Sequence, residues 1–362
     1  MKLKLTSKID LLSIFKDHTF LGVDIGTSSI KIVQLTKSKN KYKLDTYGEI
    51  RFFEKGSSED QGGASLKMLD DQVARLLAKI LIESGAKSKK AAFSVPVFSS
   101  FSTIIEMPDL EKNELKKAIE FQARQYIPAP IEQVSLSSII ISRGKDDEST
   151  KKGKLKVLLI AIPNEVKNKY ENIASLANLE VSSLEMETFP MARSVIEDTK
   201  EPTVIIDIGL SSTNFCVVDN GVVVLSHNYD ISGAVLTKAF LDFAKGDREK
   251  AEEIKKTTGL NMTPGQISMM GDFTGYLDSI ASESSRIING YYNKTSRRVT
   301  KTMLSGGTAN MPGLQDYFSN KLEMEVSIAD PFAKTTYPEE MKEILKDIGP
   351  SFAIAAGLAM KK

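Results

Sequence analysis

The sequence predicts an α/β protein with two related lobes, a ligand cleft between them and a small α+β insert in the first lobe. The main observation is a six-residue phrase that occurs twice, as DIGTSS at residues 24–29 and as DIGLSS at residues 207–212. Each copy follows one apolar run and precedes another, which is the pattern of a strand, a tight turn and a second strand. Two copies in the same context, about 180 residues apart, indicate a duplicated lobe.

The repeated turn has the chemistry of a phosphate and cation site. In such a hairpin the glycine lets backbone N–H groups turn inward, and the hydroxyl groups add further donors. The aspartate at the strand end can hold a cation through its carboxylate. A single Asp-x-Gly turn usually has no role beyond the turn itself. Two facing copies, however, predict a site for a polyphosphate and its Mg²⁺.

The first lobe is expected to begin with three strands, a helix and a fourth strand. The helix is predicted because leucine and valine side chains recur at helical spacing and Gly85 follows them. This β-β-β-α-β order is typical of a mixed sheet with helices on its faces. The predicted ranges are strands at about 20–25, 30–36 and 42–50, a helix over 69–81 and a strand over 91–97.

The pattern changes between residues 98 and 162, which predicts a separate subdomain. Its expected elements are a strand at 101–106, a helix at 109–126 and strands at 134–142 and 155–162. The chain then returns to the first lobe. The return is expected to consist of a helix capped by Asn164, a strand at 180–187 and a helix at 189–197.

The second lobe begins with the second copy of the phrase and turns back at Asp219-Asn220-Gly221. Ser232-Gly233-Ala234 leads a helix that extends to Phe243, and a charged helix follows over 249–256. A long amphipathic helix from about Pro264 to Tyr291, with Ile267 and Met270 on its apolar face, is predicted to form the main core. A strand at 300–304 then leads into Ser305-Gly306-Gly307. Asn310, Pro312 and Gly313 are expected to open the next helix and to place its N-terminal amides beside a ligand.

Composition excludes several classes of protein. The chain has 48 basic and 47 acidic residues, whereas general nucleic-acid binders have a basic excess. The single cysteine, Cys216, lies within a predicted strand, so no disulfide can form within the chain and a reducing cytosol is expected. His18 and His227 are the only histidines, which argues against zinc and against histidine-based catalysis.

The hydropathy pattern predicts no membrane span. The longest uncharged run, about thirteen residues from Ile348 to Met360, is too short to cross a bilayer. Residues 1–19 form a basic leader with apolar residues that permit a short amphipathic helix. A helix packed on the first lobe and a frayed end are the alternative interpretations of this leader.

Several motifs together resemble a known superfamily. The phrase pair and SGGTANMPGL at 305–314 are similar to the phosphate-1, phosphate-2 and adenosine motifs of the actin, Hsp70 and sugar-kinase superfamily. Within it, IEMP at 105–108, QARQYIP at 122–128 and FAIAAGLA at 352–359 resemble the PilM family, the cytoplasmic actin-like proteins of type IV pilus assembly. The resemblance covers about residues 20–360. It implies an actin-like ATPase fold whose insert corresponds to the SHS2-like subdomain 1C, with Glu185–Arg193 as the segment that connects the lobes.

The resemblance and the element pattern together predict a division of the chain into lobes. The predicted parts are a leader at 1–19, the first lobe at 20–97 and 163–202, the insert at 98–162, the second lobe at 203–347 and a C-terminal helix at 348–362 that returns to the first lobe.

The candidate site residues lie in the two turns and in the later motifs. Asp24 and Asp207 are the predicted Mg²⁺ ligands, and the predicted phosphate contacts are Gly26, Thr27, Ser28, Ser29, Gly209, Ser211, Ser212 and Thr213. Lys31 is a further phosphate candidate, with a solvent-facing position as the alternative. By resemblance, Gly233, Gly306, Gly307 and Asn310 would lie along the nucleotide. Glu252 and Lys255 would contact adenine and ribose, with a solvated i, i+3 ion pair as the alternative.

The resemblance implies a cytoplasmic ATP- and Mg²⁺-binding assembly protein at the inner face of the cytoplasmic membrane. The implied partner is a PilN-like bitopic membrane protein, whose N-terminal cytoplasmic peptide would bind in a groove beside the insert. Other pilus components are further candidate partners, and membrane contact would be mainly indirect. Leu210 and Asn214 replace residues common in relatives, so slow or absent hydrolysis is expected. The alternatives are a sugar-type small-molecule kinase and an FtsA-like division filament protein.

Overall fold

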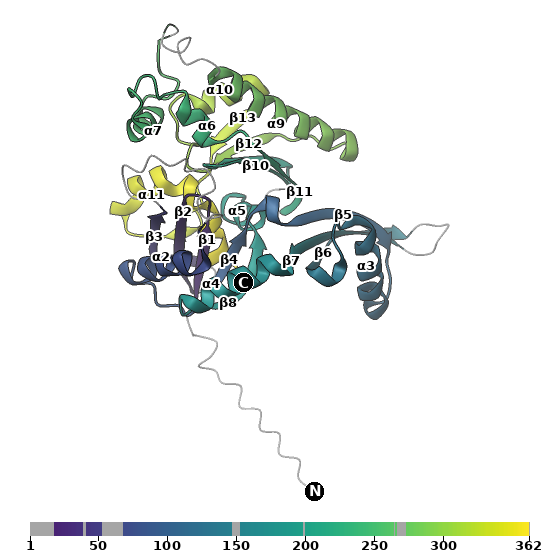
Figure 1. Cartoon of the computed structure of the whole chain (residues 1–362). Coiled ribbons are helices and arrows are strands. Elements are labelled where there is room, and N and C mark those ends of the chain that lie inside the picture. Colours follow the sequence, from purple (N-terminus) through teal and green to yellow (C-terminus); the bar gives the residue numbers. More distant parts are fainter. Residues whose placement is uncertain are drawn as a thin grey trace.

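The computed structural model describes residues 18–38, 41–52, 68–146, 153–197, 200–263, 265 and 273–361. These residues form two stacked lobes and a third module that projects to one side (Figure 1). The predicted leader helix and the start of the long helix near Ile267 and Met270 lie outside the described residues. No helix within the described ranges is both long and apolar enough to cross a bilayer.

The first lobe contains a mixed sheet in the order β14-β3-β2-β1-β4-β8. Its strands are β1 (His18–Ile25), β2 (Ser29–Ser38), β3 (Lys41–Arg51), β4 (Lys90–Val95), β8 (Glu180–Met186) and β14 (Thr335–Thr336). Strands β1, β2 and β3 form an antiparallel meander, and β4 pairs with β1 in parallel. The helices α2 (Asp70–Glu83) and α4 (Asn164–Leu176) pack on one face through a shared apolar cluster.

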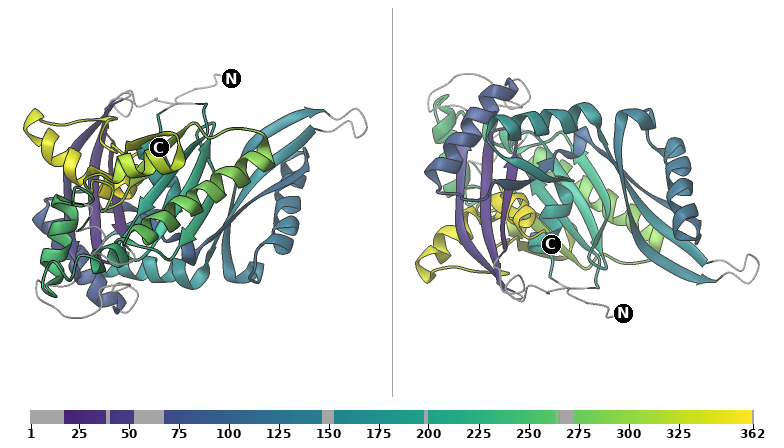
Figure 2. Two further views of the ribbon diagram at one scale, coloured as in Figure 1. Left: turned by 90° about the horizontal axis from the view of Figure 1, so that it is seen from above. Right: turned by 90° about the horizontal axis from the view of Figure 1, so that it is seen from below.

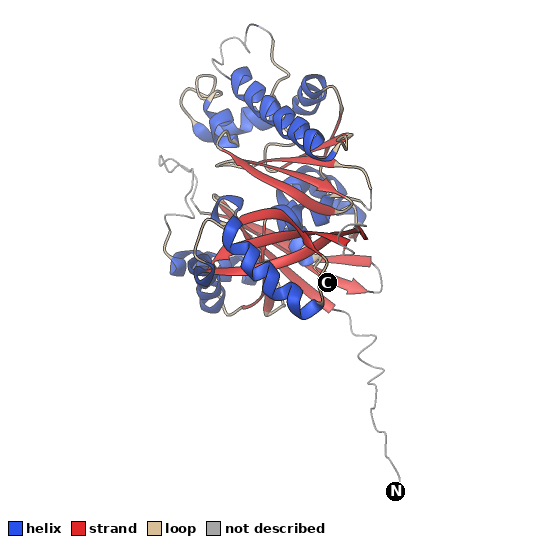
Figure 3. Ribbon diagram, turned by 90° about the vertical axis from the view of Figure 1, so that its right-hand side faces the viewer, coloured by secondary structure: helices blue, strands red, loops and turns tan. Residues whose placement is uncertain are grey.

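The second lobe contains a five-stranded sheet in the order β11-β10-β9-β12-β13. Its strands are β9 (Thr203–Ile208), β10 (Thr213–Asp219), β11 (Val222–Tyr229), β12 (Lys301–Ser305) and β13 (Glu325–Ile328). The outer face is covered by α6 (Gly233–Lys238), α7 (Arg248–Thr257), α9 (Phe273–Thr295) and α10 (Leu314–Leu322). Figure 3 shows helices over this sheet on the side away from the first lobe. The predicted long core helix is thus present as α9 in its described part.

A helical layer lies between the two sheets. It consists of α5 (Thr188–Val195) and α12 (Ala353–Ala359), and α11 (Lys342–Ile348) precedes α12. One apolar cluster joins Met191 of α5 and Leu358 of α12 to Ala92 of the first sheet and to Ile205 and Cys216 of the second. The two lobes therefore share a core through these helices, and Cys216 is a buried core residue as predicted.

The insert is a three-stranded antiparallel sheet with one helix. The strand order is β5 (Phe101–Pro108), β7 (Gly153–Pro163) and β6 (Val134–Asp146), and α3 (Lys112–Tyr126) packs on one face. A short 3₁₀ turn, η2 (Val97–Ser99), connects β4 of the first lobe to β5. Both views in Figure 2 show the insert beside the two lobes.

Local expectations fail at two places. Asn164 does not cap α4, because Pro163 occupies the N-cap position and the Asn164 side chain instead bonds to the Glu132 carbonyl and the Ser135 hydroxyl, each at 3.0 Å. The helix after Ser232 ends at Lys238, well before Phe243, and the chain continues in turns.

The chain returns to the first lobe earlier than residue 348. Strand β14 pairs in parallel with β3, and Phe332 packs with Val33 and Leu35 of the first sheet. The physical reason is that the edge of β3 offers free backbone groups, which the returning chain satisfies before α11 begins.

Gly357, in the segment FAIAAGLA, lies where α12 packs closely against α5. A Cβ atom added there would lie 1.7 Å from the Pro190 carbonyl oxygen of α5. We expect Gly357→Ala to destabilise the protein by about 3 kcal/mol or more, because neither backbone can yield without disturbing both lobes. Urea unfolding of the full chain measures this change.

Gly290→Ala is the matched control for Gly357→Ala. Gly290 is exposed within α9, and a Cβ there would meet nothing within 4 Å. We expect this variant to gain about 0.5–1 kcal/mol from helix propensity. Equal stability of the two variants would contradict the close-packing account.

Candidate functional site

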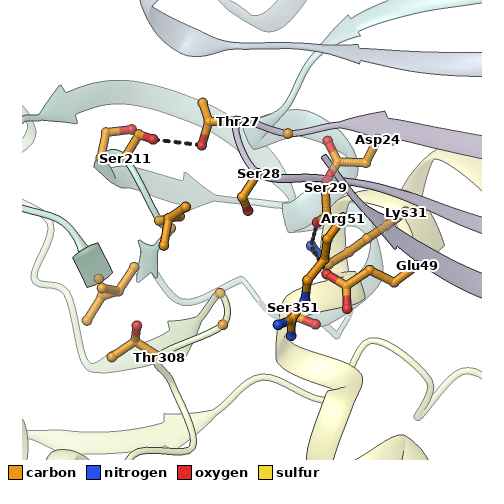
Figure 4. Close-up of a pocket in the computed structure, with 18 of the residues that line it drawn as sticks. Asp24, Thr27, Ser28, Ser29, Lys31, Glu49, Arg51, Ser211, Thr308 and Ser351 are labelled. Carbon is orange, nitrogen blue, oxygen red and sulfur yellow. Dashed lines mark hydrogen bonds and ion pairs between the residues drawn. The ribbon is translucent and has the colours of Figure 1, made fainter. Parts of the chain in front are cut away.

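A cleft of about 1380 Å³ lies between the lobes and is lined by both copies of the repeated phrase. Figure 4 shows the turn after β1 facing Ser211 of the second turn, with Thr308 on the far wall. Lining residues come from both lobes and from the start of the insert. The sequence prediction of a site between the lobes therefore corresponds to a real cavity.

The two turns have the same geometry. The Gly26 N–H donates to the Ser29 carbonyl at 3.0 Å, and the Gly209 N–H donates to the Ser212 carbonyl at 3.0 Å. The turns also contact each other, because the Ser211 hydroxyl donates to Thr27 Oγ1 at 2.9 Å. The duplication is thus structural as well as sequential, and it places two sets of donors on opposite sides of one space.

Two aspartates mark the ends of the central strands of the two lobes. Asp24 accepts a 2.6 Å hydrogen bond from the Ser94 hydroxyl, and burial raises its pKa although Lys31 and this bond oppose the rise. Burial and the nearby charge of Asp24 raise the pKa of Asp207 to about 6. Two buried carboxylates with raised pKa values, one of them raised in part by the charge of the other, form a site where a cation would relieve repulsion.

The donor set fits a hydrated magnesium ion. Within the described ranges no three acidic, histidine or cysteine side chains converge on one point, as a fully protein-ligated metal would require. Mg²⁺ commonly keeps several waters and uses one or two carboxylates together with substrate phosphates. Asp24 and Asp207 supply this number, and both line the cleft.

Lys31 lies in the wall of the cleft. Its ammonium group donates to Ser29 Oγ at 2.8 Å and pairs with Glu49 at 3.2 Å, as Figure 4 shows. The side chain is only 14% exposed, so the solvent-facing alternative does not hold. Arg51, on the next strand, brings a second basic residue to the same wall.

Glu252 and Lys255 form a buried cluster. The Lys255 ammonium bonds to the Glu252 carboxylate at 2.7 Å, to the Thr237 hydroxyl at 2.8 Å and to the Gly233 carbonyl at 3.3 Å. Burial lowers the pKa of Lys255, against the opposing effect of Glu252. Since Lys255 is 1% exposed, a solvated surface pair is the wrong description. All of these residues line the cleft.

The Ser-Gly-Gly segment brings backbone close to Asp207. Gly306 has a φ of +89°, and an added Cβ would lie 2.9 Å from Asp207 Oδ1, so no larger residue fits. A Cβ on Gly307 would meet nothing within 4 Å, which leaves this side of the cleft open. The Asn310 side chain lines the cleft but donates to the Asp347 carbonyl at 2.6 Å, so it fastens α11 to the wall.

Two predicted contacts are not brought to the cleft. The Thr213 hydroxyl is fully buried and donates to the Ile231 carbonyl at 2.6 Å, because strand alternation turns it away while Ser212 and Asn214 face the cavity. The start of α10 also lies elsewhere, since a Cβ on Gly313 would meet Leu260 and neither residue lines the cleft.

Sequence reasoning missed Glu187. It lines the cleft, and burial raises its pKa to about 8; the hydrogen bond from the Val97 N–H opposes this rise, while the charges of Asp24 and Asp207 add to it. Its only signal in the sequence was its place as the single acidic residue between Met186 and Arg193, inside the predicted connecting segment.

The sequence pattern that defines the family described as type IV pilus assembly protein PilM matches residues 22–362. The chain belongs to this family. The match covers both lobes and the insert, and it therefore includes all the residues that line the cleft.

Two solved structures share the fold of this PilM-family chain. The structure of a PilM-PilN type IV pilus biogenesis complex matches with a TM-score of 0.76 and 22% identity, over 94% of this chain and 97% of that one. The ethanolamine utilization protein EutJ from Carboxydothermus hydrogenoformans matches with a TM-score of 0.55 and 16% identity, over 95% of this chain and 89% of that one. The predicted two-lobed actin-like fold is thereby confirmed.

Glu187 makes the stability of the ligand-free protein depend on pH. Its folded-state pKa of about 8 lies above the unfolded value of about 4.3. Ionisation of Glu187 therefore does not lower the free energy of unfolding below about pH 4, and it lowers this free energy progressively as the pH rises to about 8. We expect Glu187→Gln to match the parent at pH 4 and to be more stable at pH 8.5, by up to about 5 kcal/mol.

Thermal unfolding without nucleotide or Mg²⁺ measures this difference. Glu180→Gln removes an exposed carboxylate nearby in sequence and serves as the control, because it should leave the pH profile unchanged. Parallel profiles for Glu187→Gln and the parent would contradict the assignment of a raised pKa.

Proposed function

We propose that this PilM-family chain binds a nucleoside triphosphate with Mg²⁺ in the cleft and captures the cytoplasmic N-terminal segment of a PilN-like membrane protein at its insert. The observation that carries the nucleotide part is the pair of turns with the same backbone hydrogen bond, which meet across the cleft through Ser211 and Thr27. Neither turn alone has enough donors to hold three phosphates, but the two together do.

Each group in the cleft has a distinct task in this proposal. Asp24 and Asp207 would hold a hydrated Mg²⁺, which neutralises phosphate charge when bound. The backbone amides and hydroxyls of the two turns would bind phosphate oxygens, and Lys31 would add a positive charge. The cluster of Gly233, Glu252 and Lys255 would contact the nucleoside end.

Hydrolysis is proposed to be slow. Asn214 donates its side-chain amide to Glu187 at 2.9 Å, and its side-chain oxygen accepts from the Asn228 amide at 2.9 Å. Both functional groups of Asn214 are thus engaged within the protein, and an amide is in any case a poor proton acceptor. The conformation of the protein would then depend on whether nucleotide is bound and not on repeated hydrolysis.

The insert has the surface of a docking module. Among the described residues, ten large hydrophobic side chains are exposed, and half of them lie in this small part of the chain: Phe98, Phe121, Tyr126, Ile139 and Ile140. Exposed apolar groups at this density mark interaction sites. The solved structure that matches 94% of this chain is that of a PilM-PilN complex, which supports the choice of partner. The proposed location is the cytoplasmic face of the inner membrane, with contact through the partner.

The nucleotide proposal predicts different effects at two neighbouring positions. Asp207→Asn keeps the shape but removes the metal-side charge, so we expect at least about tenfold weaker Mg²⁺-dependent binding of a fluorescent ATP analogue. Ser305→Ala is the comparison and should weaken binding only mildly, because the Ser305 hydroxyl, which donates to the Pro350 carbonyl at 3.1 Å and also hydrogen-bonds Asp207, does not line the cleft. Unchanged binding by Asp207→Asn would refute the two-turn site.

The partner proposal predicts a loss of peptide binding at the start of the insert. Phe98 is 50% exposed, so Phe98→Ala should weaken capture of a PilN-like N-terminal peptide about tenfold. Ile344→Ala removes an equally exposed apolar side chain, 54% accessible, on α11 and should have no effect. Fluorescence anisotropy with a labelled peptide measures both, and equal affinities for the two variants would remove Phe98 from the docking surface.

A further inference from the structure

Glu187 joins the floor of the cleft to the first turn of the insert. One of its carboxylate oxygens, Oε1, accepts a hydrogen bond from the Val97 N–H at 3.0 Å and another from the Asn214 side-chain amide at 2.9 Å. Val97 begins the turn η2, whereas Asn214 lies on β10 of the second lobe. A single buried oxygen therefore holds segments of both lobes.

The turn held by Glu187 faces the cleft and also leads into the docking surface. Pro96, Phe98 and Ser99 line the cleft, and Phe98 is half-exposed. Strand β5 starts directly after this turn, and both the turn and β5 contact β11 of the second lobe. In Figure 1, β5 runs from beside β11 outward into the insert. A shift of this turn would move Phe98 and the start of β5 together.

The link extends into the second lobe as a row of hydrogen bonds. The Asn228 amide on β11 donates to the Asn214 oxygen at 2.9 Å, which continues the series Val97, Glu187, Asn214, Asn228. Asn214 is directly opposite Asp207 in the pairing of β10 with β9. The row thus passes beside a proposed metal ligand on its way from the insert to the edge strand of the second lobe.

We propose that Glu187 is the positioning residue through which nucleotide in the cleft sets the orientation of the insert's first turn, and hence its affinity for the partner peptide. This inference rests on the proposed function. When a ligand moves the second lobe, Asn214 moves with β10. The Val97 turn must then follow, because otherwise the Val97 N–H loses the Glu187 carboxylate as its hydrogen-bond partner, which is unfavourable. The coupling is reciprocal, so the peptide also changes nucleotide affinity.

The test compares peptide affinity with and without nucleotide. The ligands are a synthetic N-terminal peptide of the PilN-like protein and a non-hydrolysable ATP analogue with Mg²⁺. In the parent, we expect the analogue to change the peptide Kd at least about fivefold. Glu187→Ala should reduce this change to less than about twofold, while Glu187→Gln should retain it because its amide oxygen still accepts both hydrogen bonds.

Thr188→Val is the matched control for Glu187→Ala. The Thr188 hydroxyl makes the neighbouring contact between lobes, 2.9 Å from the Ser226 hydroxyl, but it touches neither Val97 nor Asn214 through a recorded hydrogen bond and does not line the cleft. This variant should keep the fivefold change. Loss of coupling in Thr188→Val as well would mean that general loosening between the lobes, and not Glu187, is responsible, and would overturn the proposal.

Amide hydrogen exchange gives a second readout that needs no partner. The analogue should alter exchange at Val97, Ser99 and Ser100 in the parent and in Glu187→Gln, but not in Glu187→Ala. If the analogue does not bind the parent at all, the proposed function is wrong and this inference falls with it. If the analogue binds but neither peptide affinity nor exchange responds, only the role of Glu187 is wrong.

Discussion

The structure depends on the contact between α5 and α12, because this pair of helices is the layer on which both sheets pack. Gly357 lies so close to Pro190 that the two backbones touch, and the same apolar cluster reaches Ala92 on one side and Ile205 on the other. Without this layer each sheet would expose an apolar face. The position of the lobes relative to each other, and therefore the width of the cleft, follows from how closely these two helices approach.

The cleft is an electrostatically unfavourable arrangement that the rest of the fold stabilises. Asp24, Asp207 and Glu187 are buried near one another, and burial raises the pKa of each. Such groups are typical of functional sites, where a ligand supplies the missing opposite charge. The contrast with Glu252 and Lys255 is instructive, because that pair is neutralised internally. The carboxylates at one end of the cleft would thus be stabilised by a bound cation, whereas the charges of Glu252 and Lys255 neutralise each other.

Local chemistry and resemblance predicted most of the fold and much of the site. Gly26 and Gly209 predicted the two similar turns, because hairpin geometry depends on a few adjacent residues. The apolar runs predicted the positions of the strands to within a few residues. Thr213 was assigned to the cleft wrongly, because spacing does not reveal which side of a strand faces the cavity. Glu187 was missed for a different reason. Its role arises from Val97 and Asn214, which are distant in sequence and meet it only in the folded chain.

Strand β14 shows that the second lobe is joined to the first at two places. The chain crosses once between α5 and β9, and it crosses back between β13 and β14, where Thr335 pairs with Tyr42. Mechanically, two crossings define a hinge line, whereas a single crossing would act as a swivel. Opening or closing of the lobes would therefore turn about that line, whereas twisting or sliding would strain both connections at once. A change in the width of the cleft would then be largely a change in one angle between the lobes. The backbone of each crossing segment would have to absorb that change.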